Sequence, residues 1–173
     1  MTQFADTLWD LLGLRDHQRC RKAARQGGAH RPGASRPCRP MQQRYDALVD
    51  QMKQTYGVRV RKWRSSSTGC AWLVRYADGT ESKLIEAPYP KGPISCAIFL
   101  HEIAHHAIGF GRYRLRCLEE YEAWRWALDV MRAQRLNVTP AVHQRIAESL
   151  RYAVRKARNR GLKMLPDELR PYV

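Results

Sequence analysis

The stretch "FLHEIAHHAIGF", residues 99–110, contains a histidine followed directly by a glutamate, and a second histidine four positions after the first. On an α-helix, His101 and His105 lie one turn apart on the same face, so both imidazoles can reach one tetrahedral zinc ion. Glu102 is rotated by about 100° from His101, close enough to hold a metal-bound water without being a ligand. The metal lowers the pKa of that water, and Glu102 takes its proton as attack on a carbonyl begins. The spacing therefore predicts a hydrolytic centre with one zinc ion per chain.

Both histidines fall on the apolar face of their helix. An unpartnered imidazole buried there costs about 1–3 kcal/mol, whereas a metal with one further ligand satisfies both rings at once. Two core histidines bonded to backbone carbonyls are the alternative interpretation. His106 lies on the opposite face and is expected at the surface or behind the site. The apolar stripe comprises Ile94, Ala97, Ile98, Ala104 and Ile108.

A catalytic zinc site needs one more protein donor. Ile108 and Gly111 stand where the metzincin pattern requires glycine and histidine, so that class is excluded, and His143 is a distant candidate. The following helix, "LEEYEAWRWALDVM", offers three glutamates: Glu119, Glu120 and Glu122.

Acids in the first turn of a helix favour its dipole, which accounts for Glu119 and Glu120. Glu119 points more squarely at the apolar face of this helix, and Glu122 lies on its flank before a packed run. The geometry of the helix alone leaves the choice of donor open.

"HEIAHH" followed by "EYEAWRWALDVM" resembles the ImmA/IrrE metallopeptidase family, a compact gluzincin group with HExxH and a downstream glutamate. The resemblance covers about residues 40–136, and it implies that Glu122 is the third zinc ligand. It also implies cleavage of regulatory proteins, typically DNA-bound repressors on mobile genetic elements or in stress responses. Trp124 departs from the family, which commonly has Asn or Asp there. The positions that match the second signature are Glu120, Glu122, Ala123, Trp126 and Ala127.

The elements that must position these residues follow from hydrophobic periodicity and turn signals. Helices are expected over 41–56, 93–109, 118–136 and 140–161. Strands are expected in "VRVRKW" and on both sides of the Asp78–Gly79 turn. The prediction is an α+β fold with a small antiparallel sheet of about three strands, a minimal zincin-like core. Residues 83–87 are expected to form a strand, either with an exposed edge for a substrate peptide or as an ordinary strand of the sheet.

The length of 173 residues and the hydrophobic fraction of 44% favour one compact domain with appendages. We expect this domain at residues 40–165. Residues 1–39 are expected to hold a short amphipathic segment and a mobile basic tail, and residues 166–173 a C-terminal tail.

A formal charge of +15 suggests a polyanionic partner, such as DNA. The last helix carries a cationic stripe whose contacts would be to phosphates, and a merely solvated helix face is the alternative. The stripe consists of Arg151, Arg155, Lys156, Arg158 and Arg160.

The N-terminus is a poor signal peptide, and no stretch approaches the roughly 18 apolar residues of a membrane span, so no membrane contact is expected. Five cysteines without a CxxC pair fit reduced thiols in a cytoplasm.

The leading prediction is a cytoplasmic zinc endopeptidase that cleaves a specific protein, with a DNA-bound regulator as the candidate substrate. One alternative is a nucleic-acid-associated protein with a structural zinc site, and another is a phage or plasmid host-interaction protein. Four residues are candidates for stabilising the oxyanion, and the sequence does not select among them: Tyr113, Tyr121, Tyr152 and His143.

Overall fold

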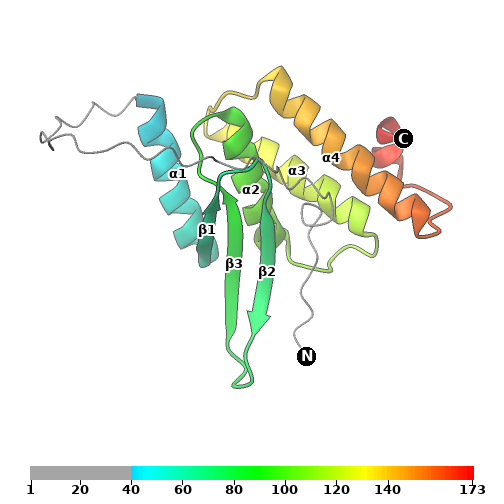
Figure 1. Ribbon diagram of the computed structural model, residues 1–173, viewed down its shortest axis with the longest axis horizontal. Helices are drawn as coiled ribbons and strands as arrows, with labels where there is room; N and C mark the ends of the chain where they lie inside the picture. Colours follow the sequence, from blue (N-terminus) through cyan, green and yellow to red (C-terminus); the bar gives the residue numbers. More distant parts are fainter. Residues whose placement is uncertain (1–39) are drawn as a thin grey trace, which may run out of the picture.

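The computed structural model describes residues 40–173, which form a small sheet covered by helices (Figure 1). The order of the elements confirms the predicted α+β class. The amphipathic segment and the basic tail expected in residues 1–39 lie outside the described residues. The elements are α1 (Pro40–Tyr56), β1 (Val58–Arg64), β2 (Cys70–Arg75), β3 (Glu81–Pro88), α2 (Pro93–Ile108), α3 (Arg116–Ala133), α4 (Pro140–Asn159) and the 3₁₀ helix η1 (Asp167–Tyr172).

The sheet is mixed, with the strand order β1-β3-β2. β2 and β3 form the predicted antiparallel hairpin, and the Asp78 carboxylate accepts the Thr80 N–H across its turn at 2.9 Å. β1 instead pairs with β3 in parallel, so the expectation of a wholly antiparallel sheet was wrong. This pairing is reinforced from the side chains, because Arg64 on β1 donates to the buried Glu86 of β3 at 3.0 Å.

β3 is the central strand and has no exposed edge, so residues 83–87 form an ordinary strand of the sheet, and the expectation of an exposed edge for a peptide was wrong. Its second half is the most buried stretch of the sheet, from Ile85 to Pro88. A strand buried on both faces belongs in the centre of a sheet rather than at its border. The edge strands within the described residues are therefore β1 and β2.

The helices are layered on the sheet in sequence order. α2 packs on β3, α3 packs on α2, and α4 packs on α3, while α1 lies beside β1 (Figure 1). α4 is amphipathic, and Thr139 caps its start by accepting the Val142 N–H. Its buried face includes Val142, Ile146, Leu150 and Val154.

α2 is buried on all sides, since every residue from Cys96 to His106 is shielded from solvent. A helix surrounded in this way is a core helix rather than an amphipathic surface helix. His106 was expected at the surface or behind the site. It is buried, and its Nε2 lies 3.0 Å from the Leu84 carbonyl of β3. Burial lowers the pKa of His106 to about 4, so the ring is neutral near pH 7 and donates this hydrogen bond.

The C-terminal residues belong to the domain instead of forming the expected tail. η1 packs against α3 and α4, and Leu169 is completely buried. None of the helices within residues 40–173 is long and apolar enough to cross a membrane.

Candidate metal centre

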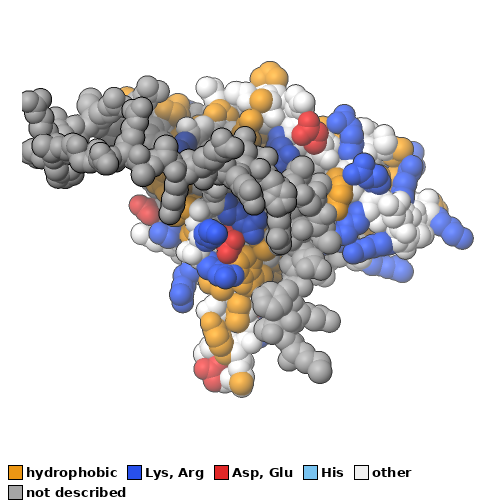
Figure 2. All heavy atoms as spheres, viewed as in Figure 1, with side chains coloured by type: hydrophobic (Ala, Val, Ile, Leu, Met, Phe, Trp, Pro, Cys, Tyr) orange, Lys and Arg blue, Asp and Glu red, His pale blue; other side chains and the backbone are white. Residues whose placement is uncertain are grey.

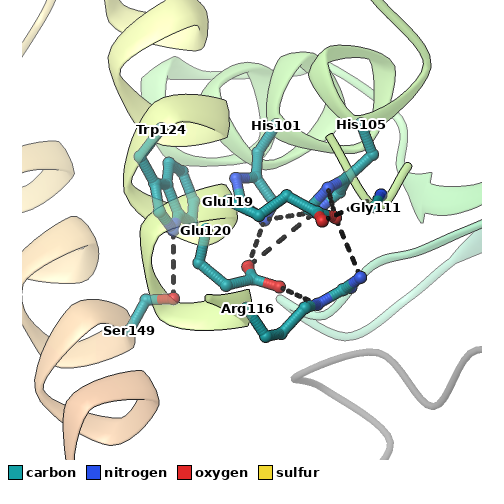
Figure 3. A network of polar contacts seen from close by, with 8 residues as sticks. All are labelled: His101, His105, Gly111, Arg116, Glu119, Glu120, Trp124 and Ser149. Carbon is teal, nitrogen blue, oxygen red and sulfur yellow. Dashed lines mark hydrogen bonds and ion pairs between the residues drawn. The ribbon is translucent and has the colours of Figure 1, made fainter. Parts of the chain in front are cut away.

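Three potential metal donors converge where α2 faces α3 (Figure 3). His101 and His105 extend from α2, and Glu120 extends from the first turns of α3. Glu120 Oε2 lies 3.2 Å from His101 Nε2 and 3.8 Å from His105 Nε2, and the two Nε2 atoms are 3.2 Å apart. All three side chains are at most 2% exposed. One turn of α2 and one residue of α3 therefore place three donor atoms around a single point.

These separations suit one tetrahedral zinc ion. Ligand bonds of 2.0–2.1 Å at tetrahedral angles put neighbouring donor atoms about 3.4 Å apart. Glu120 Oε2 is buried and makes no hydrogen bond of good geometry. Each neutral imidazole carries only one N–H, and burial without full hydrogen bonding is costly. A divalent cation at the centre would satisfy all three donor atoms at once, so the residues fit a metal ion.

The ionisation states of the donors also suit a metal. Burial lowers the pKa of His101 to about 4, an effect only partly opposed by Glu120. Burial acts to raise the pKa of Glu120, but His105 and His101 outweigh it, and the net result is a pKa of about 2. Near pH 7 the site therefore presents a neutral imidazole beside a carboxylate, the forms that coordinate zinc.

The structure places Glu122 outside this group, which corrects the choice of third donor. Glu122 is two residues after Glu120 and so points about 200° away around the helix. Its carboxylate instead pairs with Arg125 at 2.6 Å. His143, the more distant candidate, is exposed on α4.

Glu120 could have been found from the buried stripe of α3. Trp124, Ala127 and Met131 are fully buried and recur at intervals of three or four residues. Glu120 lies one turn before Trp124 on the same stripe, so it must face α2. A favourable interaction with the helix dipole therefore does not account for Glu120, whose position on the buried stripe is the stronger signal.

The two imidazoles have different surroundings. Trp124 stacks on His101 with 4.1 Å between ring centroids, and its indole N–H donates to Ser149 of α4 at 3.0 Å. His105 Nδ1 instead lies 3.5 Å from a carboxylate oxygen of Glu119. Trp124 thus packs on the ring of His101, whereas the ring of His105 lies beside Glu119 and stacks on Phe110 with 5.9 Å between ring centroids.

Contacts also run in opposite directions along the two helices. The earlier residue of α2, His101, meets the later residue of α3, Trp124, while His105 meets Glu119. α2 and α3 are therefore antiparallel at the site, in keeping with the short connection between them.

Glu102 is fully buried and is not one of the three donors. Gly69, directly before β2, packs against it so closely that a Cβ atom there would lie 2.6 Å from Glu102 Cδ. A Cβ atom at position 69 therefore requires the Glu102 side chain to move.

The cationic stripe of α4 is separate from this group of donors. Arg151, Arg155, Arg158 and Arg160 are exposed, and Lys156 is half-buried. Figure 2 shows Lys and Arg side chains gathered on the side of the molecule where α4 lies.

Glu120→Ala is expected to abolish stoichiometric zinc binding, because only two donors would remain, while Glu122→Ala is expected to retain about one zinc ion per chain. Metal content of the purified, folded variants by mass spectrometry makes the comparison. Full zinc content in Glu120→Ala together with its loss in Glu122→Ala would reinstate Glu122 as the donor.

Comparison of the chain with protein-family models, with curated proteins and with solved structures gives no match. The functional argument therefore depends on the residues of the site and on how the fold places them.

Proposed function

We propose that the protein is a zinc-dependent endopeptidase in which His101, His105 and Glu120 hold the ion. The observation that carries this proposal is the convergence of three buried donor atoms, with a fourth buried ionisable residue, Glu102, directly after His101 in the sequence. Structural zinc sites usually have four protein ligands, whereas catalytic sites have three and keep one position open. The described residues supply three donors, which favours the catalytic kind. The resemblance to the ImmA/IrrE metallopeptidases points in the same direction.

A bound zinc ion would supply a Lewis acid that polarises a carbonyl and lowers the pKa of water. Glu102 follows His101 on α2 and acts as general base, accepting a proton from the attacking water at a carboxylate oxygen. The same carboxyl group then delivers this proton to the leaving amine. Trp124 and Glu119 keep the two imidazoles in place, so the donors need little rearrangement before the reaction.

The proposed substrate is a protein, with a DNA-bound regulator as the candidate. An extended peptide requires a strand edge for backbone pairing. β2 begins beside the Gly69–Glu102 contact and is an edge strand within the described residues, so we assign the peptide to β2 rather than β3. We place the reaction in the cytoplasm, where the buried thiols of Cys96 and Cys117 stay reduced.

Glu102→Gln is expected to keep zinc and fold but to lower the rate of peptide cleavage by about 10²- to 10⁴-fold, because the amide cannot accept the proton. Proteins cut in cells that express the wild type, and left intact with Glu102→Gln, would identify the substrate by their new N-termini. Glu122→Gln is the matched control, since it alters a carboxylate on α3 that faces Arg125. Equal cleavage by wild type and Glu102→Gln would exclude Glu102 as the base.

Gly69→Ala is expected to reduce cleavage while zinc remains bound. The added methyl group must displace the Glu102 carboxyl group, which is enclosed and cannot move into solvent. Gly92→Ala is the control, because a Cβ there meets nothing within 4 Å and the backbone is extended. Cleavage rates and zinc content of both variants test the effect. Wild-type activity in Gly69→Ala would show that the position of Glu102 is not critical.

A second proposed function is binding of a polyanion, such as DNA, by the stripe on α4. The segment 151–163 contains six basic residues and no acidic residue, and its arginines at 151, 155, 158 and 160 are exposed. Such a surface attracts phosphates without reading base sequence.

Replacing Arg155 and Arg158 by Gln is expected to weaken binding to duplex DNA. The slope of the logarithm of the binding constant against the logarithm of the salt concentration is expected to become shallower by roughly 2. The matched control is the double variant in which Arg125 and Arg132 are replaced by Gln, since each of these arginines pairs with an acid on α3. Titrations by fluorescence anisotropy at several salt concentrations measure both effects. Identical salt dependence in the wild type and the α4 variant would remove this stripe as the binding surface.

A further inference from the structure

Arg116 reaches from the start of α3 to both carboxylates behind the donor group (Figure 3). Its Nη1 lies 2.9 Å from Glu119 Oε1, and its Nε lies 3.2 Å from Glu120 Oε1. The Arg116 side chain is 39% exposed, while both glutamates are 2% exposed. A guanidinium group thus enters the site from the surface and bridges two buried carboxylates.

The two oxygens of Glu120 have different partners. Oε2 faces the histidine nitrogens, at 3.2 Å from His101 and 3.8 Å from His105. Oε1 accepts the hydrogen bond from Arg116. Only one oxygen of this carboxylate is therefore directed at the point where the imidazoles converge.

Arg116 is itself held in place by its second partner. Glu119 accepts the Gly111 backbone N–H at 3.1 Å with its other oxygen, which anchors it to the loop between α2 and α3. The guanidinium group is planar and presents its donors in fixed directions, so fixing one of its hydrogen bonds also restricts the other. Gly111, Glu119 and Arg116 form a chain of contacts that ends at Glu120 Oε1.

This arrangement matters because a carboxylate can offer a metal either one or two oxygens. A catalytic zinc ion with three protein donors and one water has four ligand atoms and can accept a fifth in the transition state. If both oxygens of Glu120 bound zinc beside the two histidines and the water, the protein would fill this fifth position. We propose that Arg116 is a positioning residue that occupies Oε1, limits Glu120 to one donor oxygen and so preserves an open position on the ion. The proposal rests on the metal site of the proposed function and specifies how that site stays open.

The competing explanation is that Arg116 only neutralises the charge of Glu119 and Glu120. Loss of a neutralising charge would change metal affinity but not the number of ligand atoms around the metal. Loss of a positioning hydrogen bond would release Oε1 towards the ion. The coordination number therefore separates the two explanations, and it can be measured without a substrate.

The test compares zinc-loaded wild type, Arg116→Met and Arg125→Gln by X-ray absorption at the zinc edge. Wild type and Arg125→Gln are expected to show about four ligand atoms, and Arg116→Met about five, as Glu120 becomes bidentate. Arg125→Gln is a matched control, because it also breaks an arginine–glutamate pair of α3 at a spacing of three residues. The same coordination number in wild type and Arg116→Met would overturn the inference.

Should Arg116→Met fail to fold, a crystal structure of the zinc-loaded wild type decides the question. Glu120 Oε1 is expected on Arg116 and beyond bonding distance of the ion, and two oxygens within about 2.0–2.2 Å of zinc would overturn the inference. Absence of zinc from the folded wild type would contradict the metal site itself. A wild type with one zinc and a bidentate Glu120 would contradict only the role of Arg116.

Discussion

The arrangement depends on the cost of enclosing ionisable side chains in an apolar core. His101, His105 and Glu120 meet at one point between α2 and α3, and each would be unfavourable there alone. Their mutual proximity lowers the pKa of Glu120 despite its burial and leaves a cluster that a single cation would complete. The packing of α2 on α3 therefore determines where the three donors meet, and their mutual contacts in turn make their burial tolerable.

α3 supplies both the third donor and most of the groups that orient the donors. Glu120 and Trp124 lie one turn apart on its buried stripe, while Glu119 and Arg116 extend around the start of the helix towards His105 and the loop. Small changes in the rotation of α3 would alter all of these contacts together. The hydrogen bond from Trp124 to Ser149 extends this dependence to α4, which packs on the outer side of α3.

Local patterns in the sequence predicted the local parts of the structure. The helix of residues 93–108, the Asp78–Gly79 hairpin and the pairing of His101 with His105 all follow from spacings of a few residues. What failed depends on tertiary packing. The parallel pairing of β1 with β3 has no turn signal, and the choice of Glu120 requires knowing which stripe of α3 faces α2.

The short connection between α2 and α3 has a consequence for folding. Glu120 follows His101 by only 19 residues, so all three donors belong to one helical hairpin. Closing so short a loop costs little chain entropy, and contacts of low sequence separation form early. A divalent ion bound to these donors would therefore stabilise the α2–α3 hairpin before β1 pairs with β3 and before α4 docks. Such an ion would contribute to folding as well as to the chemistry of the site.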